Sequence, residues 1–330
     1  MARILSRADV QRCISMTEAI AAMHTAFTSL QTAQAQMPPR QAVALQGQGI
    51  ALLMPSLIQT YEQQVFAIKL ISVIPDNPIR HLPRSYATIM LLDAVTGKTL
   101  ALLDGGWLTT MRTGAVSGLA TDLLAHKDAS ILTVFGAGAQ APMQVIAIHT
   151  VRPLDEVRVV NRNDEHYQAL VAVLREMLGE ACPRVIRVHS AHEALAGASL
   201  VACATAATTP LFSWQDIALG THINAVGAFT PEMCEVDEET VRHARIVVDQ
   251  REAALTEAGD LLQPLARGLI GGAETWIELG ELLTGKQAGR SSADEVTFFK
   301  SVGLGVQDIA VALHVYNRAC ELGIGVEVDV

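Results

Sequence analysis

From residue 130 onward, short apolar runs alternate with segments of helical periodicity. The runs are nearly continuous, which is typical of parallel strands that helices cover on both faces. Helical segments between them include 141–150 and 164–178. This alternation predicts an α/β fold with a Rossmann-type doubly wound sheet. The apolar runs are 131–136, 156–161, 185–190, 199–205, 222–227 and 245–250.

The first 130 residues follow a different pattern. Residues 17–33 have the periodicity of an amphipathic helix, and "QAVALQG" and "IALLMPSLI" indicate strands. Residues 85–106 predict a hairpin whose turn contains Gly97, a residue that adopts a positive φ without strain. Helical periodicity returns at 107–125. These elements predict an α+β domain ahead of the Rossmann domain.

A last helix is expected at roughly 305–321, after "TFFKSVG". We expect it to pack back on the first domain, which makes that domain discontinuous. The predicted organisation is a substrate-binding and dimerisation domain of residues 1–117, completed by 305–330. The Rossmann NAD(P)-binding domain takes residues 118–304.

Composition excludes several classes of protein. The 330 residues are enough for two domains, and 50% hydrophobic against 18% charged residues excludes a disordered chain. A net charge of −10, without any cluster of Lys and Arg, argues against a nucleic-acid partner.

The five cysteines are odd in number and widely scattered, with no spacing typical of a zinc site. We therefore predict no metal, and reduced thiols in a cytoplasmic protein. The N-terminus lacks the apolar core of a signal peptide. The uncharged stretch 194–215 contains Pro210 and predicts a strand plus loop rather than a membrane span, so no membrane partner is expected.

The stretch "TVFGAGAQA" (133–141) joins a predicted strand to a predicted helix. Gly136 permits the tight turn, and Gly138 lets the backbone approach a pyrophosphate closely. Ala139 and Gln140, further candidates for contacts with the cofactor, lie just before the helix, whose free N–H groups attract phosphate. A purely structural glycine turn is the alternative, but this context favours dinucleotide binding.

The end of the next strand bears on the choice of dinucleotide. An acid there favours NAD through the ribose 2′-hydroxyl, whereas an arginine suits the 2′-phosphate of NADP. This chain has Asn161, Arg162 and Asn163 at that point. The residues favour NADP(H) over NAD(H), although an arginine that caps a surface turn would look the same.

Several further stretches, in order, resemble the ornithine cyclodeaminase/mu-crystallin family along nearly the whole chain. The resemblance implies a dimer of two-domain subunits with the active site between the domains. Members include ornithine and lysine cyclodeaminases, alanine dehydrogenases and reductases of cyclic imino acids. All transfer hydride at a carbon next to a carboxylate. The matching stretches are "LLMPS" (52–56), "IKLISVIPDNP" (68–78), "MLLDAVTGKTLALLDGGWLTTMRTGA" (90–115), the glycine turn, "INAVGA" (223–228) and "FFKSVGLGVQD" (298–308).

The resemblance gives three basic residues a role at the substrate carboxylate. Arg112 matches the family arginine that clamps it, and Lys69 and Arg40 match the other two basic positions. A guanidinium suits a carboxylate because it can donate two parallel hydrogen bonds. Taken singly, Arg112 could pair with an acid on its own helix, and Lys69 could be a surface charge at a strand end.

The resemblance also implies contacts around the cofactor. Asp308 matches an acid near the nicotinamide that orients or protonates, although the first turn of any helix favours an acid. Thr113, Val226, Ser301 and Val302 are further candidates for contacts with the cofactor.

One position departs from the cyclodeaminase pattern. In "AVGAFTPEMCEVD", Phe229 stands where cyclodeaminases have an aspartate that handles the amino groups of the substrate. A phenyl ring cannot accept a proton, and neither Glu232 nor Glu235 is in register. An apolar wall at Phe229 suits a ring or alkyl side chain without a distal charge.

These residues predict an NAD(P)H-dependent reductase of a small cyclic α-imino acid such as pyrroline-2-carboxylate or piperideine-2-carboxylate. Three alternatives stay open at this point. They are an ornithine cyclodeaminase with a relocated acid, an alanine-type amino-acid dehydrogenase, and a non-catalytic NADPH-dependent binder like the crystallins of the family.

Overall fold

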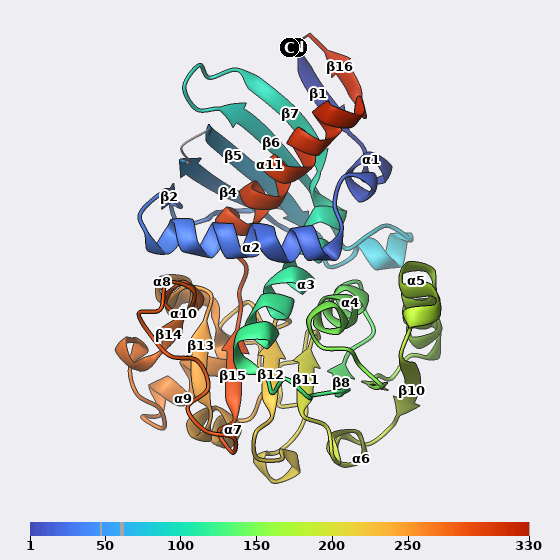
Figure 1. Cartoon of the computed structure of the whole chain (residues 1–330), viewed down its shortest axis with the longest axis vertical. Helices are drawn as coiled ribbons and strands as arrows, with labels where there is room; N and C mark the ends of the chain where they lie inside the picture. Colours follow the sequence, from blue (N-terminus) through green and yellow to red (C-terminus); the bar gives the residue numbers. More distant parts are fainter. Residues whose placement is uncertain (47, 60–62, 330) are drawn as a thin grey trace. The chain divides into compact units, whose positions relative to one another are not determined.

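The computed structural model describes residues 1–46, 48–59 and 63–329. The chain divides into two compact units (Figure 1). Unit 1 is Met1–Arg112 together with Leu304–Val330, and unit 2 is Thr113–Gly303. The first boundary falls inside helix α3 (Gly105–Leu124), five residues before the boundary expected at 117. An unbroken helix carries no loop composition, so nothing in the local sequence marks this boundary.

Unit 1 is built on one mixed sheet with the strand order β16-β1-β7-β6-β5-β4-β2, and β3 also pairs with β4. The pairing of β1 with β7 is parallel, and the other pairings are antiparallel. The predicted hairpin is confirmed as β6 and β7, with Gly97 at φ 73° in its turn. The strands are β1 (Ala2–Leu5), β2 (Ala35–Gln36), β3 (Gln41–Ala44), β4 (Ile50–Gln59), β5 (Gln64–Val73), β6 (Ser85–Asp93), β7 (Thr99–Asp104) and β16 (Val326–Val328).

Two long helices cover one face of this sheet. Helix α2 (Met16–Gln31) packs beside α11 (Gly305–Leu322), and α11 lies on β4 and β5 (Figure 1). Both helices were predicted from the sequence, and so was the packing of the last helix on the first part of the chain. Alternate residues of β5 are buried on the covered face, and Lys69 is one of them. The shorter elements of unit 1 are α1 (Arg7–Arg12) and the 3-10 turn η1 (Asn77–Arg80).

Unit 2 contains an all-parallel sheet with the order β10-β9-β8-β11-β12-β15-β13-β14. The chain builds outward from β8 in one direction and then returns to add β11 on its other side, which is the switch point of a Rossmann-type fold. The predicted doubly wound α/β class is confirmed. The strands are β8 (Ile131–Phe135), β9 (Glu156–Val160), β10 (Arg184–Val188), β11 (Leu200–Cys203), β12 (His222–Ala225), β13 (Arg245–Val248), β14 (Ile277–Glu278) and β15 (Thr297–Lys300).

All six apolar runs predicted after residue 130 are strands, and both helices predicted between them are present. The sequence did not predict β14, the insertion of β15 between β12 and β13, or the short helices. No helix among the described residues is both long and apolar enough to cross a membrane. The helices are α4 (Ala141–Val151), α5 (Asp164–Leu178), α6 (Ala191–Leu195), α7 (Glu238–His243), α8 (Arg251–Glu257), α9 (Gly259–Ala266) and α10 (Leu279–Leu283); the 3-10 turns are η2 (Gly179–Ala181), η3 (Trp214–Asp216) and η4 (Ala273–Thr275).

Candidate active site

The glycine turn of unit 2 directly follows β8. Gly136 has φ 100°, and a Cβ built on it would lie 2.7 Å from the Ala204 carbonyl oxygen, so only glycine fits. A Cβ on Gly138 would meet no heavy atom within 4 Å, and Gly138 and Ala139 are both exposed. Helix α4 begins after Gln140 without a side-chain cap for its first N–H groups. Open space beside uncapped amides fits a pyrophosphate.

The residues after β9 form a compact turn. The Asn163 side chain accepts from His166 N at 3.0 Å and caps α5, while the Asn161 amide donates to the Asn163 carbonyl. Arg162 is exposed and makes no hydrogen bond or ion pair with the described part of the chain. Its guanidinium is therefore available to a ligand at this strand end.

A second arginine supports the same turn from β10. Arg187 Nη1 pairs with Asp164 Oδ1 at 2.6 Å, and Nη2 donates to the Asn161 carbonyl at 3.3 Å. The first acid after β9 is therefore already engaged by a cation.

In unit 1, three residues distant in sequence form a buried charge cluster. Lys69 Nζ lies 2.6 Å from Asp308 Oδ2, and Arg112 Nε lies 3.1 Å from Asp308 Oδ1. Lys69 and Asp308 are each 2% exposed and Arg112 is 6% exposed. These three predicted residues are thus in contact, and one carboxylate serves both cations. The pairing of Arg112 is with an acid of α11 rather than of its own helix.

Gln307, which the sequence analysis did not single out, completes this cluster. Its Oε1 accepts from Arg112 Nη1 at 2.8 Å and from Leu304 N at 3.0 Å, at the start of α11. The guanidinium plane is therefore fixed by two consecutive residues of one helix turn. The N-cap of this helix is Leu304 rather than Ser or Thr, so no capping-box motif in the sequence marks Gln307.

The surroundings of Lys69 weaken its hold on a proton. Burial lowers the pKa of Lys69 to about 8, against the opposing attraction of Asp308. The positive charges of Arg112 and Arg40 lower it further, which places Arg40 near the cluster. An ammonium with such a pKa can donate a proton near neutral pH.

The other predicted contact residues lie in unit 2. Thr113 is buried in α3, where its carbonyl accepts from Gln144 Nε2 at 3.1 Å. Val226 and Ser301 are buried directly after β12 and β15. The Ser301 hydroxyl donates to Asp249 Oδ2 at 2.9 Å, so toward a ligand it can act only as an acceptor.

The sequence profile of the ornithine cyclodeaminase/mu-crystallin family matches residues 1–323. The chain belongs to this family. It is 36% identical to a Δ1-pyrroline-2-carboxylate reductase of Bacillus cereus over 328 residues, covering 99% of both chains.

Solved structures of family members agree with this assignment. The Thermococcus litoralis Δ1-pyrroline-2-carboxylate reductase, in complex with NADH and L-proline, matches with a TM-score of 0.92 and 37% identity, covering 99% of this chain and 100% of that one. An archaeal alanine dehydrogenase, a dimer with bound NAD, matches with a TM-score of 0.91 and 32% identity over 99% of each chain.

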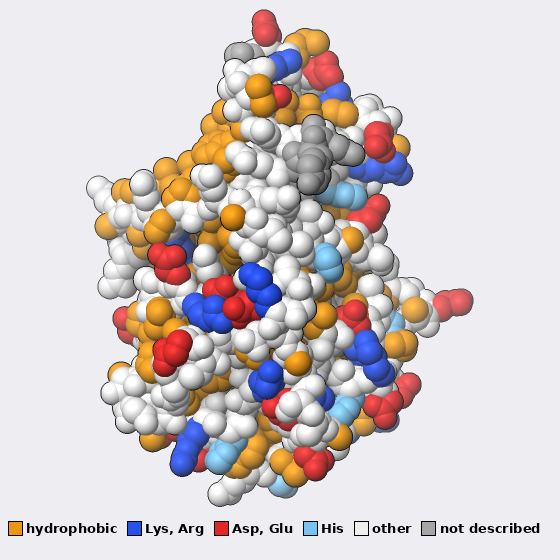
Figure 2. All heavy atoms as spheres, turned by 60° about the vertical axis from the view of Figure 1, so that its left-hand side comes forward, with side chains coloured by type: hydrophobic (Ala, Val, Ile, Leu, Met, Phe, Trp, Pro, Cys, Tyr) orange, Lys and Arg blue, Asp and Glu red, His pale blue; other side chains and the backbone are white. Residues whose placement is uncertain are grey.

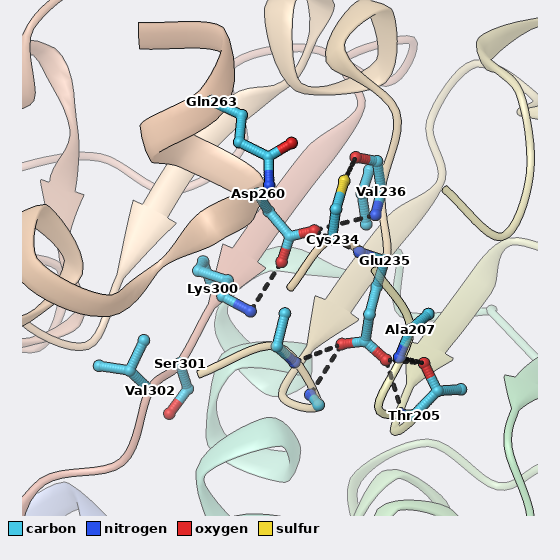
Figure 3. Close-up of polar contacts among 12 residues, drawn as sticks. Thr205, Ala207, Cys234, Glu235, Val236, Asp260, Gln263, Lys300, Ser301 and Val302 are labelled. Carbon is cyan, nitrogen blue, oxygen red and sulfur yellow. Dashed lines mark hydrogen bonds and ion pairs between the residues drawn. The ribbon is translucent and has the colours of Figure 1, made fainter. Parts of the chain in front are cut away.

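Phe229, which the resemblance predicts in place of the cyclodeaminase aspartate, has two acids near it in sequence. Phe229 is 42% exposed, on the loop after β12, and Glu232 is exposed on the same loop. Glu235 is fully buried, and its carboxylate accepts four hydrogen bonds from Thr205, Gly227 and Ala228 (Figure 3). Glu235 is therefore occupied by the protein itself and is not a free base. Among the described residues, no group of three or more His, Cys, Asp or Glu could hold a metal ion.

Asp308→Asn tests the buried charge cluster. The substitution leaves the Arg112 guanidinium buried without a counter-charge and removes the group that favours the charged form of Lys69, so we expect a loss of about 3–5 kcal/mol in the free energy of unfolding at pH 7. Urea denaturation measures it. The control is the double variant Lys69→Met/Asp308→Asn, which removes one unpaired cation and should recover part of the loss. Equal stability of Asp308→Asn and wild type would show that the ion pairs do not hold β5, α3 and α11 together.

Proposed function

We propose that this protein is an NAD(P)H-dependent reductase of a small cyclic α-imino acid, with pyrroline-2-carboxylate or piperideine-2-carboxylate as substrate. The observation that carries the proposal is the buried cluster of unit 1. Lys69 and Arg112 supply two cationic groups, whereas Asp308 supplies one carboxylate, and Arg40 lies close enough to lower the pKa of Lys69. The excess positive charge suits a small anion with one carboxylate.

Each residue of the cluster has a distinct task in this reaction. Arg112, with its plane fixed by Asp308 and Gln307, clamps the substrate carboxylate, and Arg40 adds a second cationic contact. Alignment by such contacts is a large part of catalysis. The nicotinamide, when bound, supplies a hydride to the C=N carbon. Lys69 gives the nitrogen its proton, so that the imine becomes a secondary amine, and Lys69 then regains a proton from water.

The loop after β12 favours reduction over deamination. Phe229 offers an apolar surface for a ring, and the carboxylate of Glu235 is held by four donors. We propose that ornithine is not deaminated, because no acid replaces the cyclodeaminase aspartate at this position. The relatives named above support reduction of an imino acid, and the archaeal alanine dehydrogenase makes reductive amination of pyruvate the second candidate.

We propose that NADP(H) is preferred over NAD(H). Arg162 is exposed after β9, and Asp164 is engaged by Arg187, so an available cation rather than a free acid stands at this strand end. The relatives bind NADH or NAD, which makes NAD(H) the alternative to be tested.

We also propose a homodimer formed through the sheet face of unit 1 that α11 does not cover. A row of apolar residues, Pro55, Ile68, Met90 and Leu102, crosses four strands in register, and all four are only partly buried. The neighbouring Leu70 is 50% exposed. Figure 2 shows hydrophobic side chains gathered on the upper part of the molecule. An exposed patch of this kind marks an interface, and the archaeal relative is a dimer.

The five unpaired cysteines fit a reducing cytoplasm.

Oxidation of NADPH and NADH against a panel of cyclic imines, pyruvate with ammonia, and ornithine tests the reaction. We expect turnover with a cyclic imine and no ammonia from ornithine. Arg112→Lys should lower kcat/KM for the imine by roughly 100-fold, because an ammonium lacks the planar fork. Robust ammonia release from ornithine that Arg112→Ala abolishes would overturn the proposal. Turnover with pyruvate and ammonia alone would favour the second candidate.

The role of Lys69 predicts a pH dependence. Since the protonated amine donates, kcat/KM should fall as pH rises through about 8, the pKa of Lys69. In Lys69→Arg the guanidinium keeps its charge but cannot give up a proton, so kcat/KM should fall strongly and the decline near pH 8 should disappear. Arg112→Lys is the control and should keep the decline of wild type. An unchanged profile in Lys69→Arg would assign the titration to another group, such as the imine.

The proposed cofactor preference depends on Arg162. Arg162→Ala should weaken NADPH binding by about 1.5–3 kcal/mol, the range for a hydrogen bond to a charged group. NADH binding should change little. Titration of nucleotide fluorescence measures both. A wild-type chain that already binds NADH more tightly than NADPH would refute the preference.

The proposed dimer interface is tested with Ile68→Glu. Two carboxylates forced into an apolar interface should split the dimer into monomers, because burying an unpaired charge is costly. Light scattering after gel filtration gives the mass. Val95→Glu, at a residue 73% exposed in the β6–β7 turn, is the control and should leave the dimer intact. A dimeric Ile68→Glu protein would place the interface elsewhere.

A further inference from the structure

The buried carboxylate of Glu235 joins two loops that follow neighbouring strands. Its Oε1 accepts from Thr205 N at 2.6 Å and from Thr205 Oγ1 at 2.8 Å, after β11. Its Oε2 accepts from Gly227 N at 2.8 Å and from Ala228 N at 3.0 Å, after β12 (Figure 3). Both loops leave the carboxyl edge of the sheet, where ligands of doubly wound folds bind.

Two glycines lie close to Glu235 or to the Thr205 loop that it binds. A Cβ on Gly227 would overlap the Thr205 carbonyl oxygen and Glu235 Oε1, so the glycine of "AVGA" is required by the position of the glutamate. A Cβ on Gly136 would lie 3.1 Å from Thr205 Cγ2 and 2.7 Å from the Ala204 carbonyl oxygen. The loop that Glu235 holds is therefore the one against which the glycine turn after β8 packs.

A second buried acid, Asp260, binds the backbone of Glu235. Asp260 Oδ1 accepts from Glu235 N at 2.6 Å and from Val236 N at 3.0 Å, and Asp260 Oδ2 pairs with Lys300 Nζ at 2.8 Å (Figure 3). All three charged side chains are fully buried or nearly so. A well-packed apolar core could give similar stability, so buried ions are better explained by the geometry that they impose.

The loop that carries Phe229 has close contacts on both sides. Glu235 accepts from Ala228, directly before Phe229. On the other side, a Cβ on Gly259, the neighbour of Asp260, would overlap the Met233 carbonyl oxygen and lie 2.7 Å from that of Thr230. Phe229 thus projects from a short segment whose backbone is pinned on both sides.

We propose that Glu235 is a positioning residue, whose carboxylate, backed by Asp260 and Lys300, sets the loops after β11 and β12 for dinucleotide and substrate. The proposal rests on the dinucleotide binding proposed above for the glycine turn. Glu235 acts through Thr205 on the glycine turn, and through Gly227 and Ala228 on Phe229. It does not contact the reacting atoms and exchanges no proton with them.

Glu235→Gln is the direct test, because it keeps the shape of the side chain. Its carboxamide oxygen can accept from one loop, but its NH2 group faces the N–H donors of the other. We expect the variant to fold and its Kd for NADPH to rise about 10- to 100-fold, from the loss of hydrogen bonds to a charged group. At saturating NADPH, kcat should fall, and KM for the imine should rise by a smaller factor than Kd for NADPH, since Arg112 still clamps the substrate carboxylate whereas Phe229 is held less firmly.

Two matched sets of controls separate positioning from general loss of stability. Thr205→Val removes the hydroxyl that donates to Glu235, whereas Thr205→Ser keeps it, so Thr205→Ser should bind NADPH more tightly than Thr205→Val does. This pair tests the clamp even if Glu235→Gln fails to fold. Asp122→Asn removes a different carboxylate of unit 2, which pairs with Arg152 at 2.8 Å, and should lower the melting temperature without changing the Kd.

The outcomes are distinct because NADPH binding is measured without substrate. Wild-type affinity in folded Glu235→Gln would overturn the inference alone. So would equal weakening in Glu235→Gln and Asp122→Asn, or equal affinities of the two Thr205 variants. A wild-type chain that binds neither NADPH nor NADH would overturn the proposed function and this inference with it.

Discussion

The carboxylate of Asp308 holds together the part of the chain on which the proposed chemistry depends. Lys69 comes from β5 and Arg112 from α3, and each would be costly to bury without a counter-charge. Because one acid on α11 serves both, the last helix must return to the sheet of the first unit for that sheet to carry buried cations at all. The return of α11 also brings Gln307 to Arg112, so the orientation of the guanidinium and its charge balance come from one helix turn.

In unit 2, buried carboxylates hold backbone segments in place by accepting hydrogen bonds from N–H groups. Asp249, Glu235 and Asp260 are buried, and each accepts hydrogen bonds from backbone N–H groups in irregular segments. Buried amides without partners would destabilise such segments. Since these loops follow β11, β12 and β15, the acids fix the edge of the sheet at which a dinucleotide is expected to bind. Flexible loops there would lose part of the binding free energy in becoming ordered.

Much of this architecture could be predicted from the sequence. Apolar runs located the strands from β8 to β13, and the glycine turn was visible because Gly136 needs a positive φ. The resemblance assigned Lys69 and Arg112 to the substrate carboxylate and Asp308 to the surroundings of the nicotinamide, but it did not predict that Asp308 pairs with both cations. The insertion of β15 between β12 and β13 could not be foreseen, because strand order depends on long-range pairing. Nor could the clamp at Glu235, since a single glutamate in a loop has no periodicity and its four donors are distant in sequence or belong to backbone.

The chemistry of the site depends on which acids already have partners within the protein, more than on how many acids are present. Asp308 pairs with two cations, and the carboxylate of Glu235 accepts four hydrogen bonds, so both acids are already engaged by the protein itself. Lys69 is different, because burial brings its pKa to about 8 and makes its proton exchangeable near neutral pH. A site with excess positive charge and one readily donated proton matches the reduction of a carboxylate-bearing imine, in which the nitrogen gains a proton. Deamination of ornithine would instead need a base beside the amino groups, and the resemblance predicts Phe229 at the position where the cyclodeaminases have one.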